Sequence, residues 1–269
     1  MVNKNLFFLF AILSVVLLGA CKNEFEKIRT SGNTDLIYKK GLEYFDQQEY
    51  QKAQTLFELV LSSFRGKKES ETLYYKYAYT HYYLKNYILG SYYFKSAANI
   101  FSTGEFKEES EYMAAYCNYC MSPDYKLDQT ETLKAIDGFQ AFINTYPAST
   151  RVDDANKRID ELRAKLSKKA LEEATLYFNI KQYQSAITSF SNILTDFPDI
   201  KEREYVKYMI IKANYDWADR SFRFKQGERF NALLDRYEDF VNKYPKSKYL
   251  KEVKSFYRNS KLKLKELNL

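Results

Sequence analysis

Apolar residues recur at spacings of three and four along most of the chain, with charged and polar residues between them. This spacing places the apolar side chains on one face of an α-helix. Within it, a small residue followed by large apolar residues four and seven positions later, and then by a proline, occurs twice: Ala135, Phe139, Phe142 and Pro147, and again Ala186, Phe190, Ile193 and Pro198. We therefore expect a repeated helical unit.

Including the small residue of the preceding helix extends the pattern to five copies. They are Gly41, Ala53, Phe57 and Val60; Ala78, Gly90, Phe94 and Ala97; Ala115, Ala135, Phe139 and Phe142; Ala174, Ala186, Phe190 and Ile193; and Ala213, Leu233, Tyr237 and Phe240. The third and fifth copies carry an eight-residue insertion between their helices. The pattern resembles the tetratricopeptide repeat, although the consensus Trp is absent. The resemblance implies an all-α, right-handed solenoid of about five helix pairs, each burying its apolar face against its neighbours.

Two further segments have helical spacing outside this pattern. Over Val152–Tyr177 the apolar spacing is three or four throughout, which predicts one helix of about thirty residues that starts near Ser149. The segment Tyr249–Leu267 predicts a C-terminal capping helix with a Lys-rich outer face. We expect repeats one to three over residues 34–148, and the joining helix, repeats four and five and the capping helix over residues 149–269.

The first twenty residues are typical of a secretory signal. The apolar run Leu6–Leu18 is too short to span a membrane comfortably. It ends in Leu18-Gly19-Ala20-Cys21, which resembles the bacterial lipobox and implies cleavage before Cys21 and acylation of that residue. Several acyl chains would anchor the protein stably. The alternative is an ordinary cleaved signal with an incidental cysteine.

The residues after Cys21 refine this expectation. Lys22 stands where many such lipoproteins that remain in the inner membrane have Asp, so the resemblance favours the outer membrane. Residues 22–33 are polar and non-periodic, and we expect residues 21–33 to form the lipidated cysteine and a polar tether.

Composition agrees with a helical protein and adds a basic C-terminal region. The chain of 269 residues contains 8 Gly and 4 Pro, too few for many strand turns. The formal net charge is +7, and Lys243–Glu266 holds nine Lys and Arg residues against Glu252 and Glu266. Such a face suits nucleic acid, anionic lipid or an acidic partner, or is simply a solvated helix face.

Few residues carry candidate chemistry. His81 is the only histidine, and its position in the repeat favours a core residue over a catalyst or ligand. Cys117 and Cys120 are typical of buried helical cysteines, with a redox pair as the alternative. We find no Ser/His/Asp set, phosphate loop or carboxylate-rich metal loop, and therefore expect neither an enzyme nor a cofactor or metal site.

Aromatic residues occupy the positions of the first helices that would face the concave surface of the repeats. Spacings of four and three place each set on one helix face. The candidate peptide-binding residues are Tyr38, Phe45, Tyr75, Tyr79, Tyr82, Tyr112, Tyr116 and Tyr119. Tyr offers apolar area and a hydroxyl at low entropic cost, which suits peptide binding. In the alternative interpretation, these rings pack together and fill the groove themselves.

Taken together, a lipobox, a tether and five such repeats resemble the BamD (ComL/YfiO) family of outer-membrane β-barrel assembly lipoproteins. The most specific likeness is Tyr146-Pro147-Ala148-Ser149, followed by Asp154-Ala155, Lys157-Arg158-Ile159 and Asp196-Phe197-Pro198-Asp199. The resemblance implies a scaffold on the periplasmic face of the outer membrane, held by acylated Cys21. Its implied partners are the C-terminal segments of unfolded barrel proteins and the periplasmic domains of a BamA-like insertase, with no nucleic acid. Another tetratricopeptide-repeat lipoprotein adaptor, in envelope maintenance or glycan uptake, is the alternative.

Overall fold

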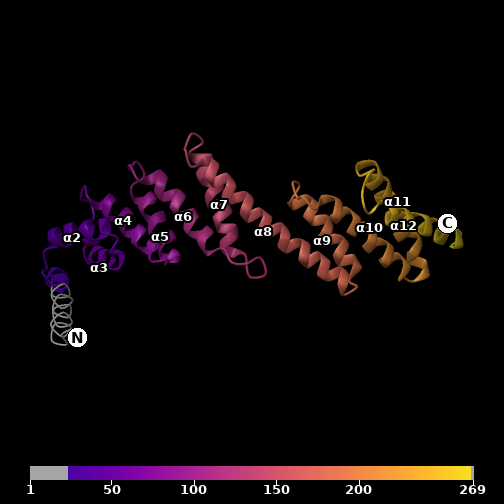
Figure 1. The fold of residues 1–269 in the computed structure, drawn as a ribbon, viewed down its shortest axis with the longest axis horizontal. Coiled ribbons are helices and arrows are strands. Elements are labelled where there is room, and N and C mark those ends of the chain that lie inside the picture. The colour runs from indigo at the N-terminus through magenta and orange to yellow at the C-terminus, as the bar shows by residue number, and fades with distance from the viewer. Residues whose placement is uncertain (1–23, 268–269) are drawn as a thin grey trace, which may run out of the picture. The chain divides into compact units, whose positions relative to one another are not determined.

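The structure is a computed structural model that describes residues 24–267. The expected signal, residues 1–20, and the lipidation site Cys21 lie outside the described residues. In the part described, every regular element is a helix, which confirms the all-α prediction (Figure 1).

The helices follow one another as five pairs and a final helix, as the repeat pattern predicts (Figure 1). The pairs are α2 (Thr34–Asp46) with α3 (Tyr50–Val60), α4 (Ser70–Tyr83) with α5 (Tyr87–Ile100), α6 (Lys107–Met121) with α7 (Thr130–Thr145), α8 (Val152–Asn179) with α9 (Tyr183–Asp196), and α10 (Arg203–Asp219) with α11 (Arg223–Lys243), before α12 (Leu250–Glu266). The predicted long helix is α8, which has 28 residues.

Small residues occur where helices cross, both within a pair and between neighbouring pairs, and larger side chains fill the space beside them. A Cβ atom placed on Gly41 would lie 2.7 Å from Cε1 of Phe57, and one on Gly90 would lie 3.1 Å from Sγ of Cys117. The repeat phenylalanines Phe57, Phe94, Phe139 and Phe190 are completely buried. Close packing at these crossings explains why the repeat pattern is defined by small residues and aromatics.

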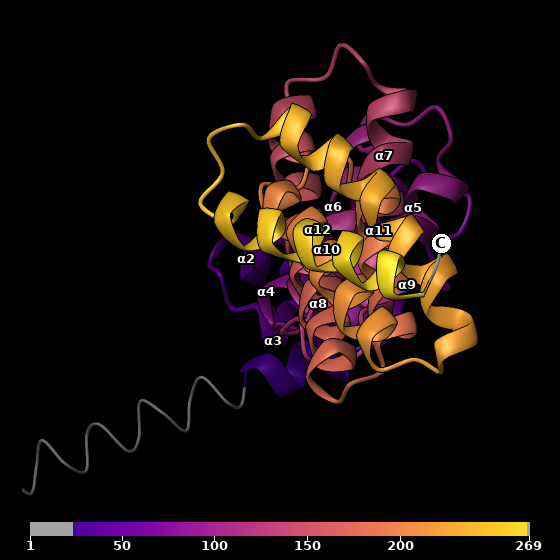
Figure 2. The same ribbon diagram turned by 90° about the vertical axis from the view of Figure 1, so that its right-hand side faces the viewer.

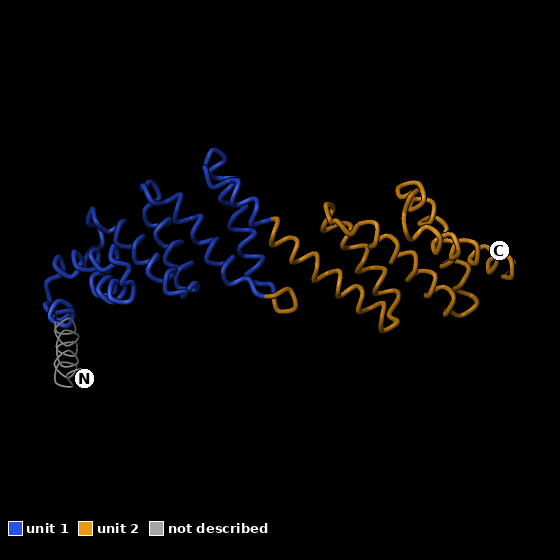
Figure 3. The backbone as a smooth tube through the Cα atoms, in the orientation of Figure 1, with its two compact units in different colours: residues 1–123, 129–159 blue, residues 124–128, 160–269 orange. Residues whose placement is uncertain are grey.

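The chain divides into two compact units, which Figure 3 shows in different colours. Unit 1 comprises the described residues up to Pro123 together with Gln129–Ile159, and unit 2 comprises Asp124–Asp128 and the residues from Asp160 onward. Helix α8 therefore contributes residues 152–159 to unit 1 and the rest of its length to unit 2.

Each unit has its own apolar core. In unit 1, one cluster is built around Leu56, Phe57 and Leu73. In unit 2, a cluster around Phe190 and Ile211 includes Val253 of α12. Helices α11 and α12 lie side by side in both views (Figure 1, Figure 2). These contacts of α12 with α11 and with the core of unit 2 agree with the predicted C-terminal capping helix.

The two insertions of equal length take different forms. In the third repeat, residues 122–129 form the connection between α6 and α7. In the fifth repeat, α10 ends at Asp219 and α11 begins at Arg223, so the added residues lengthen the helices instead. The fifth repeat consequently has a short connection at residues 220–222.

The expected polar tether contains a helical segment. Residues 24–29 are helical. Ile28 is only 6% exposed, and Phe25 packs against the core that α2 and α3 share. Phe25 and Ile28 are three positions apart and therefore share one helix face, which packs against the core. Residues 24–29 thus belong to the folded part of unit 1.

His81 is a core residue, as predicted. The side-chain amide nitrogen of Gln54 lies 2.9 Å from Nδ1 of His81, and the Tyr93 ring stacks on the imidazole at 5.1 Å. Burial lowers the pKa of His81 below its ordinary value near 6.5. Between this lowered pKa and about 6.5, the folded chain therefore keeps a neutral imidazole where the unfolded chain binds a proton.

The stability of the protein is expected to fall as the pH drops below about 6.5, because the unfolded chain then binds more protons at His81 than the folded chain does. This contribution is fully present above pH 6.5 and is lost as the pH falls through the lowered pKa. Urea unfolding across this range measures it. In a His81→Gln variant this slope should disappear, and an unchanged slope would contradict the assignment to His81.

Candidate binding surfaces

Six of the eight predicted peptide-binding residues form one aromatic surface on α4 and α6, here called the tyrosine face. Its members are Tyr75, Tyr79 and Tyr82 of α4 and Tyr112, Tyr116 and Tyr119 of α6. Tyr112, Tyr116 and Tyr119 stack in sequence, with ring centroids 5.9 and 5.6 Å apart. Tyr82 contacts Tyr116 across the two helices at 6.1 Å. The face is therefore continuous between the second and third repeats.

The other two predicted residues have different surroundings. Phe45 contacts Tyr83, which in turn stacks on Tyr79 at 5.7 Å, so Phe45 extends the aromatic contacts toward α2. The Tyr38 ring packs against Phe64, which is buried in the core of the first repeat. Tyr38 is thus half-buried in contact with its own repeat.

The tyrosine face is partly filled by its own rings. Tyr112 is 2% exposed and is therefore unavailable for direct contact with a ligand. Tyr75 stacks on Phe106 at 4.2 Å, but Tyr79, Tyr82, Tyr116 and Tyr119 are only half-buried. The structure thus combines the two interpretations of the sequence: some rings form the floor, and others remain accessible above it.

Two arginines near the start of α8 lie over the α6 part of this face. The guanidinium of Arg151 lies 4.4 Å from the centre of the Tyr112 ring, and that of Arg158 lies 4.9 Å from Tyr119 and 5.5 Å from Tyr116. Cations at these distances are attracted to the ring faces. Arg151 and Arg158 are seven positions apart, a spacing that places two residues on the same side of a helix. This spacing is the sequence signal by which the two arginines could have been grouped.

Carboxylates link the arginines to the tyrosine hydroxyls. Glu109 accepts hydrogen bonds from the Tyr79 hydroxyl at 2.7 Å and from Arg151 at 2.6 Å. Asp154 accepts a hydrogen bond from the Tyr112 hydroxyl and pairs with Arg158 at 3.3 Å. The sequence reasoning did not find these four charged residues. They fix the positions of the rings and place two ion pairs beside the aromatic surface.

These hydroxyls stay protonated at neutral pH. Burial, followed by the hydrogen bond to Glu109, raises the pKa of Tyr79 well above its usual range. Burial and the hydrogen bond to Asp154 do the same for the pKa of Tyr112. Partial burial opposes ionisation of Asp154, yet the Tyr112 hydroxyl and Arg158 lower the pKa of this carboxyl overall. The network therefore pairs phenol donors with carboxylate acceptors.

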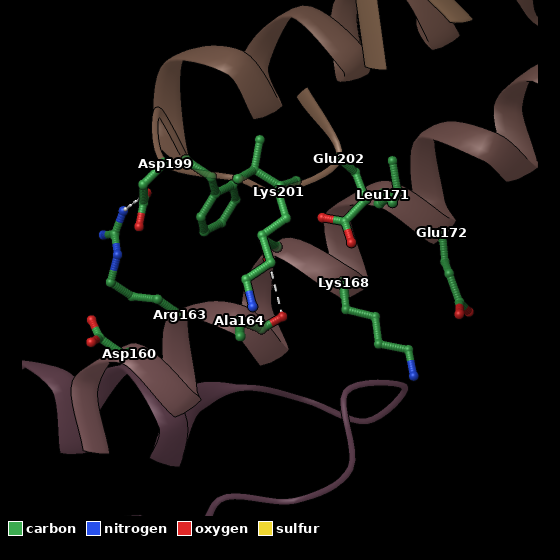
Figure 4. A pocket seen from close by; sticks show the side chains of 12 residues that line it. Asp160, Arg163, Ala164, Lys168, Leu171, Glu172, Asp199, Lys201 and Glu202 are labelled. Atoms are coloured by element: carbon green, nitrogen blue, oxygen red, sulfur yellow. Dashed lines mark hydrogen bonds and ion pairs between the residues drawn. The ribbon is translucent and has the colours of Figure 1, made fainter. Parts of the chain in front are cut away.

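A second surface, in unit 2, is a groove of about 770 Å³ beside the later part of α8. One wall carries Arg163, Lys168 and Leu171 of α8, and the other is the turn from Phe197 to Glu202. Figure 4 shows Arg163 beside Asp199, with which it forms an ion pair of 3.2 Å, and Leu171 and Glu172 farther along the groove. Charged side chains thus border an apolar floor, a composition that suits a protein partner.

An adjoining cavity extends this surface along α8. It shares Leu171 and Glu172 with the groove and is also lined by Tyr125 and Leu176. The Tyr125 hydroxyl donates a hydrogen bond of 2.8 Å to Glu172, which holds the insertion of the third repeat against α8. Leu176 is exposed, so this part of the surface offers apolar contact as well.

The two cysteines of the described residues are free thiols in or near the core of the third repeat. Cys117 is buried and Cys120 half-buried, and both thiols are free. Burial raises the pKa of Cys117 to about 12, which disfavours the nucleophilic thiolate. Over residues 24–267, no group of three or more His, Cys, Asp or Glu could hold a metal ion. No helix in that range is long and apolar enough to cross a membrane.

Comparison with known proteins gives one family match. The model of the family YfiO, described as an outer membrane lipoprotein, matches residues 31–212. None of the curated proteins matches the chain. The matched range contains the tyrosine face, both arginines above it and the groove beside α8.

Proposed function

The chain belongs to the YfiO family of outer membrane lipoproteins, and from this premise we propose that it is a scaffold in the assembly of outer-membrane β-barrel proteins. In this proposal it is held on the periplasmic face of the outer membrane by acyl chains on Cys21. It binds unfolded barrel proteins and a BamA-like insertase, and it catalyses no reaction. The family resemblance expected from the sequence is thereby confirmed, whereas these specific roles are the proposal.

The tyrosine face is the proposed site for the C-terminal segments of unfolded barrel proteins. The observation that supports this best is its continuity from α4 to α6 through Tyr82 and Tyr116. Half-exposed rings offer apolar area and hydroxyl groups to the side chains of an extended peptide. Arg151 and Arg158 lie over the neighbouring rings, and in this proposal a peptide carboxylate competes with Glu109 and Asp154 for their guanidinium groups.

The groove beside α8 is the proposed docking site for the periplasmic domains of the insertase. Its apolar floor includes Leu171, Phe197 and Ile200. Arg163 and Asp199 form an ion pair at its edge, and charged residues of a partner can bind to either side chain. Buried apolar contact would supply affinity, and the charges would select the partner.

Photocrosslinking in intact cells tests both assignments. A photoreactive residue in place of Tyr116 is expected to capture unfolded barrel proteins, and one in place of Lys201 is expected to capture the insertase. Tyr92, which is exposed on α5, is the matched control position and should capture neither. Capture of peptidoglycan-binding or glycan-uptake proteins at both test positions would instead support the alternative adaptor function.

A further inference from the structure

Two phenylalanines are exposed where α11 begins: Phe222 is the last residue of the connection from α10, and Phe224 lies in the first turn of α11. Phe222 and Phe224 are each 79% exposed, the highest values among the large apolar side chains of the described residues. Their rings stack on each other, with centroids 6.0 Å apart and planes 11° from parallel. Leaving two such rings in water is unfavourable, so a partner surface is expected to cover them.

Directly beside Phe222 lies a cavity of about 380 Å³ with basic walls. It is lined by Lys181, Tyr183, Trp217, Arg220, Ser221, Phe222, Lys225 and Arg229, none of which is acidic. Two carboxylates partly offset these charges. Glu228 lies 3.8 Å from Lys225, and Asp216 interacts electrostatically with Arg220. Four cations around one small cavity still leave an excess of positive charge.

The aromatic walls hold these cations in position. The guanidinium of Arg229 lies 3.7 Å from the centre of the Trp217 ring and donates a hydrogen bond to the Ser221 hydroxyl. Arg220 lies 5.7 Å from the centre of the Tyr183 ring. Stacking on an aromatic ring leaves the edges of a guanidinium open to donate hydrogen bonds to an anion.

The end of α12 adds further positive charge. Arg223 donates a hydrogen bond of 3.0 Å to the backbone carbonyl of Glu266, which joins the connection to the last turn of α12. That turn carries Lys265 and also Lys263, which pairs with Glu266 at 3.2 Å. Only the last turn of α12, at the end of the basic C-terminal region recognised in the sequence, therefore lies beside Arg223, which stands between the two phenylalanines in the chain.

We propose that this surface, formed by the cavity together with Phe222 and Phe224, is a contact site for anionic phospholipid at the membrane surface. The cations of the cavity hold the phosphate of the headgroup, and the two phenylalanines enter the boundary of the acyl chains. Basic residues beside exposed aromatic residues are the combination that binds anionic membranes peripherally.

Two features favour a bilayer over a protein partner. The apolar side chains protrude, whereas the neighbouring cavity is lined by cations; protein sites usually place apolar groups in the concave part. Lipid chains can also rearrange around a protruding ring, whereas a folded protein partner needs a pocket that already matches it. The proposal rests on the membrane location in the proposed function, but it is independent of the client and insertase assignments.

Vesicle binding tests this proposal with an internal probe. Trp217 is the only tryptophan of the chain and lines the cavity, so its fluorescence reports on this site alone. The assay uses residues 21–269 with the substitution Cys21→Ser, so that no acyl chain contributes to vesicle binding. Vesicles of phosphatidylethanolamine and phosphatidylglycerol should change the Trp217 emission and carry the protein with them on flotation. Vesicles of phosphatidylcholine should do so much less.

Variants separate the two parts of the site. Phe222→Ser together with Phe224→Ser is expected to weaken vesicle binding at least about tenfold. Arg220→Gln together with Lys225→Gln is expected to weaken it roughly fivefold for each cation removed and to reduce its dependence on salt. The matched controls, Tyr92→Ser and Lys254→Gln, alter exposed residues elsewhere and should leave binding unchanged.

Three outcomes would overturn the proposal. The phenylalanine variant could bind as tightly as the parent, the parent could bind both kinds of vesicle equally, or it could bind neither. If it binds neither and a photoreactive residue in place of Phe224 captures a protein in cells, the surface is a protein interface. None of these results would affect crosslinking from Tyr116 and Lys201, so a failure here is distinguishable from a failure of the proposed function.

Discussion

Replacing Phe190 by Ala is expected to lower the free energy of unfolding of unit 2 by about 3–5 kcal/mol, because the change leaves a large cavity in a closely packed core. Phe190 is completely buried and belongs to the same cluster as Ile211 and Val253. Urea unfolding followed by the fluorescence of Trp217 measures the effect, since this residue reports on unit 2.

The matched control makes the same substitution at an exposed site in the same unit. Phe224→Ala should change the free energy of unfolding by no more than about 0.5 kcal/mol. Equal effects of the two substitutions would contradict the packing that the repeat pattern and the structure both assign to Phe190.

Replacing Tyr116 by Ala is expected to weaken binding of a C-terminal barrel-protein peptide by roughly 30-fold, equivalent to about 2 kcal/mol. Tyr116 is half-buried, and its ring contacts Tyr82, Tyr112 and Tyr119, so its loss interrupts the tyrosine face at its centre. The dissociation constant of a labelled peptide that ends in an aromatic residue, measured by fluorescence anisotropy, gives the effect.

Two further variants define what the result means. Tyr116→Phe keeps the ring and should bind nearly as well as the parent, and Tyr92→Ala removes an exposed ring of α5 and should have no effect. Circular dichroism must show that Tyr116→Ala remains folded. If it unfolds, or if its dissociation constant is unchanged, the rings serve to pack the repeats and the peptide binds elsewhere.

The helix pairs could be predicted from the sequence because five weak patterns share one phase. Gly41 and Gly90, two small residues that the pattern identified, lie at helix crossings where an added Cβ atom would meet a neighbouring side chain within 3.1 Å. The lengths of the helices were harder to predict. Equal insertions became a loop before α7 and extra helical turns in the fifth repeat, because tertiary contacts decide between these forms.

The tyrosine face could be predicted only in part. Helical spacing identified its rings, but Arg151 and Arg158 come from the next repeat, and spacing within one helix says nothing of its neighbour. The burial of Tyr112 depends on its contacts with Phe139 and Phe142 of α7, which are likewise tertiary. The exposed Phe222 and Phe224 had no special place in the repeat pattern, and only the structure shows how much of each ring is uncovered.

The division of α8 between the two units has a consequence for the order in which the protein matures. A chain is synthesised and exported with its N-terminus first, so α4 and α6 emerge before Arg151, Asp154 and Arg158 do. Until then Glu109 lacks Arg151, and the hydroxyls of Tyr112 and Tyr119 lack Asp154 and Arg158. The face proposed to receive other unfolded proteins therefore passes through a stage in which it is itself incomplete, and only the arrival of the next helix ends that stage.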